Sequence, residues 1–514
     1  MNTPTLFLLL VTSIALSACG GGGKGKSSIP ATSSAVTSSS AVSSNGLANS
    51  SGAANSNSAV SLNSAASSSL AVLVFLPKIE INSGNNVIVN EPKVDVTMKV
   101  TEYDANNLAT VTYDGFAGAE YRGSSSQFFN QLFDVNGDPT GIFKKSLGIE
   151  TRDSSGAGID ATLLGFPAEE DWVLLAPFSD KTLMRDTLIY SLAREMGGYA
   201  SRWKYFELYL NDEYKGIYIL LEKIKRDPQR LNISNLKAVD NEGEELTGGY
   251  IIKIDKTSGE DLANPEVENV YLDSFSFVSE QVDDAFNNKH HFIYSEPKSE
   301  DITEPQKAYI QNYVHEFEAA LASENFKDEV TGYRNYIDVD SFIDYFILNE
   351  LSRNVDGFNL SLYLVKDKNK KLALGPVWDF NLAFGNAGWC GAERTYGWAY
   401  NHAVECPGVT AFPVPFWWDK LLTDPYFVNK LKARWASLRI TTLANAALAT
   451  KVDTTATQLK STTALTQNFQ TWPILTILVW PNQNIWNTYD GEVNQLKTWL
   501  NARTTWLDQQ FQAM

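Results

Sequence analysis

The sequence predicts an α+β protein with two lobes. In the first half of the folded region, apolar and polar residues alternate with a period of two, which is typical of strands. In the second half, apolar residues recur every three or four positions, which is typical of helices. Strands followed by helices favour an α+β fold over a parallel α/β sheet. About 440 residues follow the N-terminal segment, enough for a large core and two lobes.

The strands are expected in the first half of this region. They are residues 70–81, 93–101, two strands around a long loop within 118–152, 205–210, 214–222 and 248–255. The pair 205–210 and 214–222 reads as a hairpin through Asn211-Asp212-Glu213. The second strand of this pair is almost wholly apolar, so we expect it to lie centrally in its sheet.

The helices are expected mainly after residue 300. An earlier helix over residues 180–196 is stopped by two glycines. Thr303 and Gln306 form a capping box for a second helix. Asp340 is expected to cap a third, and a long helix closes the chain. The apolar residues expected to face the core on the last three helices are Ile310, Val314, Phe317, Leu321, Phe342, Ile343, Phe346, Ile347, Val493, Leu496, Leu500, Leu507 and Phe511.

The N-terminus is typical of an exported lipoprotein. Residues 1–19 contain an apolar run too short to span a bilayer, which ends in Leu16-Ser17-Ala18-Cys19. This end resembles the bacterial lipobox, so Cys19 is the expected lipidation site. Residues 20–73 are mostly Ser, Ala, Asn, Gly and Val, and this composition predicts a disordered Ser-rich tether. We therefore expect a lipid-anchored protein of the cell envelope, on the outer membrane, in the periplasm or at the cell surface.

The charge and the cysteines restrict the class of protein. The formal net charge is −18, and it becomes −20 without Lys24 and Lys26, the two charged residues before residue 74. A domain this acidic is not suited to binding nucleic acid. Outside the cytoplasm, Cys390 and Cys406 are expected to form a disulfide. We expect a monomer.

A glycine- and serine-rich loop is the first candidate site. Arg122, Gly123 and Ser124 lie in it, and Lys144 and Lys145 follow after a long loop. Free backbone N–H groups in such a loop can face anionic oxygens, and a nearby lysine can add a point charge. The alternative is an ordinary turn. Glu222 ends the apolar strand, and it is either a solvated terminus or a residue at the border of a cleft.

Two aspartates form the second candidate site. Asp356 and Asp379 lie 23 positions apart, at the two ends of an expected hairpin. Because a hairpin returns its ends to one place, the two carboxylates are expected to converge, with Asn359 or Asn381 nearby. Oxygen ligands of this kind suit Mg²⁺ or Mn²⁺ rather than zinc. The alternative is that each aspartate only caps a turn.

The order of these parts resembles that of protein kinases. They too have a loop over the phosphates, a strand lysine, an Asp with an Asn close behind it, and a second metal-binding Asp. More specifically, the chain resembles the spore coat protein H (CotH) kinase-like family over residues 74–514. The matching stretches, in order, are YRGSSS…KK, DWVLLAPFSDKTLMRDTLIYSLAREMG, LYLNDEYKGIYILLEKI, GGYIIKID, DVDSFIDYFILNELSRNVDGFNLSLYL, PVWDFNLAFGN and WWDKLLTDPYFVNKLKARWASLR.

The resemblance implies an atypical, minimal protein-kinase-like fold. It also implies transfer of the ATP γ-phosphate to Ser or Thr of secreted or surface proteins, with Mg²⁺ or Mn²⁺. By the resemblance, Lys145 or Lys144 would bind phosphates, and Asp356 would act at the reacting centre with help from Asn359. Asp379 would be the main metal ligand, and Glu222 would line the nucleotide cleft. Arg122, Asp180 and Arg185 match family positions without an assigned role.

The sequence also departs from the family. Many members have an acidic residue where this chain has Asn381, and residues 388–415 look like an insertion over the cleft. A catalytically inactive kinase-fold scaffold is therefore one alternative. A surface- or carbohydrate-binding lipoprotein is another, because aromatic residues make up 12% of the chain. Five tryptophans instead fall in segments that read as helical core, which favours packing: Trp472, Trp480, Trp486, Trp499 and Trp506.

Overall fold

The computed structural model describes residues 74–123, 126–134, 138–257, 270–283, 287–401, 406 and 412–514. The expected signal peptide, Cys19, the tether 20–73 and Ser124 lie outside these residues. The chain divides into Met1–Ser69 and Leu70–Met514, and the fold described below belongs to the second unit.

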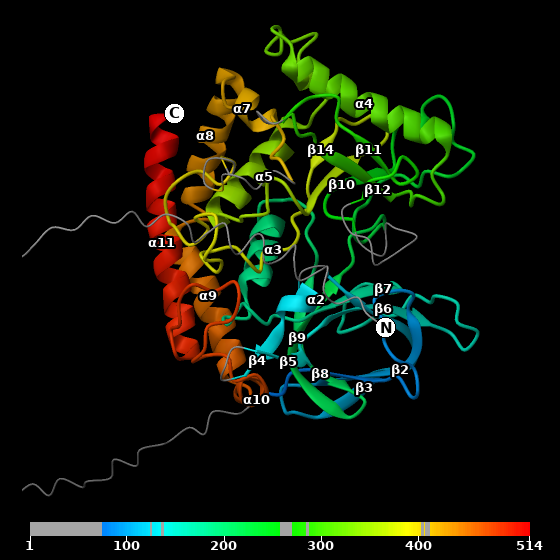
Figure 1. Ribbon diagram of the computed structural model, residues 1–514, viewed down its shortest axis with the longest axis vertical. Helices are drawn as coiled ribbons and strands as arrows, with labels where there is room; N and C mark the ends of the chain where they lie inside the picture. Colours follow the sequence, from blue (N-terminus) through cyan, green and yellow to red (C-terminus); the bar gives the residue numbers. More distant parts are fainter. Residues whose placement is uncertain are drawn as a thin grey trace, which may run out of the picture. The chain divides into compact units, whose positions relative to one another are not determined.

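Seven strands close into a barrel in the order β1-β2-β3-β6-β7-β9-β8 (Figure 1). These strands are β1 (Lys78–Asn82), β2 (Val94–Tyr103), β3 (Ala109–Arg122), β6 (Ser146–Arg152), β7 (Asp171–Leu175), β8 (Trp203–Leu210) and β9 (Glu213–Glu222). Neighbouring strands are antiparallel except at the closure, where β1 pairs in parallel with β8. Between β3 and β6 lie helix α2 (Ser126–Phe129) and the hairpin β4 (Gln131–Phe133) and β5 (Pro139–Phe143).

The barrel interior is built by the alternating residues of its strands. Val96, Met98 and Val100 of β2 point into one apolar cluster with side chains of β1, β6 and β9. The β8–β9 hairpin turns at Asn211 and Asp212, whose φ angles of 51° and 63° are left-handed. Two such residues in succession match the twist of a two-residue hairpin turn, and Asn and Asp tolerate this conformation better than most residues.

A second, antiparallel sheet has the strand order β11-β12-β10-β13-β14. Its strands are β10 (Tyr250–Ile254), β11 (Ser276–Val278), β12 (His291–Glu296), β13 (Leu362–Lys366) and β14 (Ala373–Leu374), with the 3-10 turn η1 (Glu245–Thr247) ahead of β10. Strand β10 lies at its centre, and β13 and β14 form the hairpin expected between Asp356 and Asp379.

Helices supply most of the remaining structure. They are α3 (Arg185–Glu195), α4 (Glu304–Ala322), α5 (Val339–Ser352), α7 (Trp417–Leu421), α8 (Pro425–Arg439), α9 (Asn445–Lys460), α10 (Ala464–Thr471) and α11 (Tyr489–Ala513), with the 3-10 turn η3 (Tyr333–Asn335). Helix α11 packs beside α9, α8 and α5 (Figure 1). One large apolar cluster joins these helices to α3 and to the second sheet. Among the described residues, no helix is both long and apolar enough to cross a bilayer.

The α+β prediction is confirmed, with strands first and most helices later. The capping box at Thr303 and Gln306 is present, and the four apolar residues expected on α4 are fully buried. The cap predicted at Asp340 is wrong, because Asp338 accepts hydrogen bonds from the first turn of α5. The expected helical placement of Trp480 and Trp486 is also wrong, since both are exposed in the segment between α10 and α11.

His290 lies buried between two carboxylates. Its Nδ1 is 2.6 Å from Asp283 Oδ2, and its Nε2 is 3.1 Å from Glu318 Oε1. Burial opposes protonation, but hydrogen bonds and charge from these two carboxylates raise the pKa of His290 from 6.5 to about 9. The protonated ring therefore ties the β11–β12 connection to α4.

This arrangement predicts a pH dependence of stability. The folded pKa is raised, so the stabilisation from His290 is fully present below pH 6.5 and is lost as the pH rises through 9. We expect the free energy of unfolding to fall between pH 7 and 9, and His290→Gln to flatten that slope. Urea denaturation at a series of pH values measures both, and equal slopes in the two proteins would contradict this role.

Candidate active site

One cleft collects side chains from the barrel and from the second sheet. Its lining includes Arg122 and Gly123 at the end of β3, and Asp356, Asp379 and Asn381 from the segments flanking β13 and β14. Strand β10 and the residues directly after it contribute Lys253, Asp255 and Lys256 to the same cleft. The two ends of the predicted hairpin therefore converge in this cleft. Arg122 and Gly123 of the predicted glycine-rich loop line the same cleft.

Asn354 bridges the two aspartates. Its Nδ2 donates to the backbone oxygen of Asp379 at 3.3 Å, and its Oδ1 accepts from the backbone N–H of Asp356 at 3.3 Å. Gly357, directly after Asp356, lies so close to α5 that a Cβ there would be 1.8 Å from Asn349 Oδ1. Tyr345 Oη donates to the Gly357 carbonyl at 2.6 Å. Contacts of Asn354 and Gly357 thus fix the backbone on both sides of Asp356.

The carboxylates of the cleft repel one another. Burial, followed by the charges of Asp356 and Asp255, raises the pKa of Asp379 to about 7, and Lys256 partly opposes this. Burial is also the main cause of the raised pKa of Asp356. The Asp379 side chain nevertheless remains accessible from the cleft. A site that gathers negative charge in this way favours a bound cation.

The two candidate asparagine ligands are placed differently. Asn381 lines the cleft, and its Nδ2 donates to Asp379 Oδ1 at 2.8 Å. Asn359 is buried and does not belong to the cleft lining; its Nδ2 donates to the Phe412 carbonyl at 3.1 Å. Within the described part of the chain, Asn359 Oδ1 has no hydrogen-bond partner although it is buried. Such an oxygen is costly to leave unpaired, and it fits a cation ligand.

The predicted lysines and Glu222 do not line this cleft. Lys144 is buried against α10, where its Nζ donates to Asn468 Oδ1 at 3.0 Å and burial lowers its pKa to about 7. Lys145 lies over the Tyr121 ring, with its Nζ 4.4 Å from the ring centroid. Glu222 is buried and forms an ion pair with Arg202.

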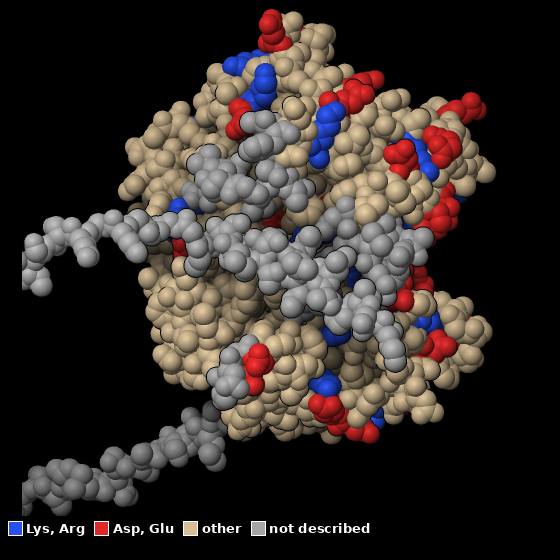
Figure 2. Space-filling model, in the orientation of Figure 1, with Lys and Arg blue, Asp and Glu red and all other residues tan. Residues whose placement is uncertain are grey.

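Other cations line the cleft in place of these lysines. They are Arg122, Lys223, Lys253 and Lys256. Sequence reasoning did not select Lys223, Lys253, Asp255 or Lys256, although Lys223 and Lys256 directly follow predicted strands and Asp255 ends one. The end of a predicted strand is the same signal that singled out Glu222. On the face shown in Figure 2, basic and acidic side chains are interspersed.

Asp180 and Arg185, to which the resemblance assigns no role, connect α3 to the segment that carries Asp379. Asp180 accepts hydrogen bonds from the backbone of Thr182 and Arg185, and it forms a buried ion pair with the Arg185 guanidinium. The Nε of Arg185 then donates to the carbonyl of Ala383 at 3.1 Å. This pair therefore ties the start of α3 to the segment that carries Asp379.

A further acidic group lies on the barrel, away from these aspartates. Among the described residues, Glu169, Glu170 and Asp171 are the one set of three potential ligands close enough to share a metal ion. Lys225 Nζ lies within 3.3 Å of all three carboxylates, and Arg230 is 3.1 Å from Glu169. Lysine and arginine thus supply the positive charge here, so this group is not a candidate metal site.

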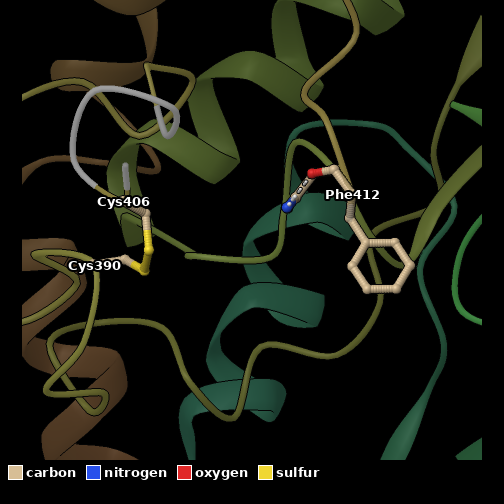
Figure 3. Close-up of a disulfide and its surroundings, with 4 residues drawn as sticks. Cys390, Cys406 and Phe412 are labelled. Carbon is tan, nitrogen blue, oxygen red and sulfur yellow. Dashed lines mark hydrogen bonds between the residues drawn. A yellow bond between two sulfur atoms is a disulfide. The ribbon is translucent and has the colours of Figure 1, made fainter. Parts of the chain in front are cut away.

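The expected disulfide between Cys390 and Cys406 is present (Figure 3). Phe412 follows shortly after Cys406, and its carbonyl accepts the hydrogen bond from Asn359. None of the described residues between 388 and 415 lines the cleft. Arg353 donates instead to the carbonyls of Gly391 and Gly397. The described part of the expected insertion thus packs on the helical core and does not form part of the cleft lining.

The disulfide is expected to stabilise this segment. Its two cysteines are 16 residues apart, and closing a loop of that length contributes about 3 kcal/mol in the chain-entropy description. We expect the Cys390→Ser/Cys406→Ser variant to lose about 2–4 kcal/mol of unfolding free energy. Guanidinium denaturation with and without dithiothreitol measures this. Dithiothreitol should destabilise the natural chain and leave the double variant unchanged; equal sensitivity would contradict the prediction.

The donor set of the cleft fits a hard divalent cation. Asp379, Asp356 and Asn381 offer carboxylate and amide oxygens, and no sulfur or imidazole ligand accompanies them in the described lining. The family described as CotH kinase protein matches residues 119–507, about three quarters of the chain. No curated protein matches the chain. Since the family match covers well over half of the sequence, the chain belongs to the CotH kinase protein family.

Proposed function

We propose that this protein is a metal-dependent kinase that transfers the ATP γ-phosphate to Ser or Thr hydroxyls of exported proteins. The observation that carries the proposal is the convergence of Asp356 and Asp379 in a cleft also lined by Arg122 and three lysines. We further propose a kinase-like division into two lobes, with the barrel on one side of the cleft and the second sheet with its helices on the other.

Asp379 is the main metal ligand in this proposal, supported by Asn381 and Asn359. A bound Mg²⁺ or Mn²⁺ would neutralise phosphate charge in the transition state. The raised pKa of Asp379 supports this role, because the carboxylate lacks sufficient compensating positive charge within the protein. The unpaired Oδ1 of Asn359 offers a second oxygen close to Asp356.

Asp356 is the proposed proton acceptor for the attacking hydroxyl. Its carboxylate lines the cleft, and burial raises its pKa, which makes it a better base than an exposed aspartate. The contacts of Asn354 and Gly357 fix the backbone that carries this carboxylate. Such positioning of the reacting groups supplies much of the rate enhancement in phosphoryl transfer.

Phosphate binding is assigned to cations that line the cleft. Arg122 can contact two phosphate oxygens at once, and Lys223, Lys253 and Lys256 add point charges. Lys145 and Lys144 match the family pattern in sequence, yet their ammonium groups contact Tyr121 and Asn468. We therefore propose Arg122 and the lysines at the ends of β9 and β10 as the principal phosphate ligands.

The protein is proposed to act in the cell envelope as a monomer anchored through lipid on Cys19. The Ser-rich segment 20–73 would then hold the catalytic domain at a distance from the membrane. Acceptor proteins would have to be exported and within reach of this tether. The acidic character of the chain argues against nucleic acid as a partner.

A catalytically inactive scaffold is the second candidate. The observation that favours it is the hydrogen bond from Asn381 Nδ2 to Asp379 Oδ1, since the amide directs a donor at the main candidate ligand. Surface or carbohydrate binding receives support only from the exposed rings of Trp480 and Trp486. Nucleotide- or polysaccharide-dependent thermal stabilisation distinguishes these alternatives.

The deciding experiment is a transfer assay with γ-labelled ATP. The purified full-length protein is incubated with a fraction of exported proteins and with Mg²⁺ or Mn²⁺, and parallel samples contain EDTA. We expect label on Ser or Thr, and none in EDTA. Failure to label any protein with either metal would refute the kinase proposal. Binding of nucleotide without transfer would then support the scaffold.

A further inference from the structure

We propose that Asp186 is a positioning residue that fixes Asp379 through the backbone of Phe380. The inference deepens the kinase proposal and rests on it, because it concerns the orientation of the proposed metal ligand. Asp186 lies in the first turn of α3, its side chain is buried, and it also lines the cleft. Asp186 and Phe380 are 194 positions apart, so the sequence alone does not indicate that they are in contact.

The central contact is a hydrogen bond to the residue after Asp379. Phe380 N–H donates to Asp186 Oδ1 at 2.7 Å. Phe380 is itself buried, so its N–H would otherwise be an unpaired donor away from water. A carboxyl oxygen can accept this bond whether Asp186 is ionised or protonated, so the buried N–H is satisfied in either state.

Asp379 needs such support because of its backbone conformation. Its φ is +61°, in the left-handed region, which Asp tolerates better than most residues but adopts less readily than glycine. A residue keeps this conformation only where its surroundings hold it. The neighbouring contacts are the Asn354 bond to the Asp379 carbonyl and the stacking of Tyr190 on Trp378, with ring centroids 6.1 Å apart.

Helix capping does not explain Asp186. Helix α3 begins after Met184 without a side-chain cap, and the backbone N–H of Arg185 is satisfied by Asp180 Oδ2 at 2.8 Å and not by Asp186. Burial and the charge of Asp379 both disfavour ionisation of Asp186, which raises its pKa to about 8. A buried acid close to other acids costs stability, and acids placed in this way are typical of functional sites.

Two substitutions separate the hydrogen bond from simple loss of the side chain. Asp186→Asn keeps a carbonyl oxygen that can accept from Phe380 N–H, whereas Asp186→Ala removes the acceptor. Residues that orient metal ligands typically contribute about 10–100-fold to metal affinity or activity. We expect Asp186→Ala to weaken Mn²⁺ binding and to lower kcat by about this factor, with an unchanged KM for the acceptor. Asp186→Asn should stay within about threefold of the natural chain in both measurements.

The experiment uses full-length protein, and Mn²⁺ binding is followed by electron paramagnetic resonance in the absence of ATP. Circular dichroism identifies a variant that has failed to fold, and Asp453→Ala, on the surface of α9, is the matched control. The outcomes separate positioning from charge. If Asp186→Ala binds Mn²⁺ as tightly as the natural chain does, the inference is overturned. Equal losses in Asp186→Ala and Asp186→Asn would also overturn it, since charge would then matter instead of positioning. If the natural chain binds Mn²⁺ without transferring phosphate, the kinase proposal fails while the binding comparison still decides the role of Asp186. If the natural chain binds no Mn²⁺, this inference fails, and the transfer assay still decides the kinase proposal.

Discussion

Asp379→Ala is expected to lower kcat for phosphate transfer by about 10³-fold or more. A metal ion contributes several kcal/mol to stabilising the transition state, and about 4 kcal/mol corresponds to 10³-fold. Asp379 is the proposed main ligand, and its carboxylate is accessible from the cleft that also holds Asp356. Initial rates with labelled ATP at saturating Mg²⁺ or Mn²⁺ measure the effect. Mn²⁺ affinity should fall in parallel.

Removing only the charge of Asp379 should not destabilise the fold. The folded pKa of Asp379 is raised to about 7 from a usual 3.8, so the ionised carboxylate disfavours the folded state above pH 3.8, increasingly up to pH 7. We expect the Asp379→Asn variant, which also tolerates the left-handed backbone at this position, to melt at or above the temperature of the natural chain at pH 7.5. Asp453→Ala serves again as the control, because its exposed ion pair with Lys497 contributes at most about 1 kcal/mol. Retained transfer in Asp379→Ala would exclude Asp379 as the metal ligand.

The sequence predicted those parts of the site that depend on local pattern. Asp356 and Asp379 converge because a hairpin brings its two ends together, and alternation and turn residues reveal a hairpin. The capping box at Thr303 is equally local, since its reciprocal bonds join residues three positions apart. Asp338 and Asp340 illustrate the limit of such reasoning. Both are adequate caps, and which of them caps α5 depends on where the first turn begins.

The rest of the site depends on contacts between distant segments. The barrel closes through β1 and β8, whose paired residues Lys78 and Glu207 are far apart in sequence, and period-two alternation does not specify a partner strand. Lys144 turns toward Asn468 because α10 packs beside β9, which no local pattern indicates. Asp186 reads as an ordinary first-turn acid of α3. Its bond to Phe380 becomes visible only in the folded chain.

A buried ion pair holds the C-terminal helix to the core. Arg503 of α11 lies 2.8 Å from Glu350 of α5, and both side chains are fully buried. The Arg503 guanidinium also donates to the carbonyls of Glu350 and Gly397, and Glu350 accepts from the backbone of Ala399 and Tyr400. The pair thus links α5, α11 and the segment that follows Cys390.

Removing one partner of this pair should cause a large loss of stability. We expect Arg503→Met to lower the free energy of unfolding by about 3–5 kcal/mol, because it leaves the Glu350 carboxylate buried without its main counter-charge. Burial already raises the pKa of Glu350, and Arg503 is the principal charge that opposes this rise. The double variant Arg503→Met/Glu350→Gln removes the uncompensated charge and should recover part of the loss. Guanidinium denaturation of the three proteins measures these differences. If Arg503→Met alone leaves the midpoint unchanged, or if the double variant is less stable than the single one, the pair does not hold α11 to α5 in the way described.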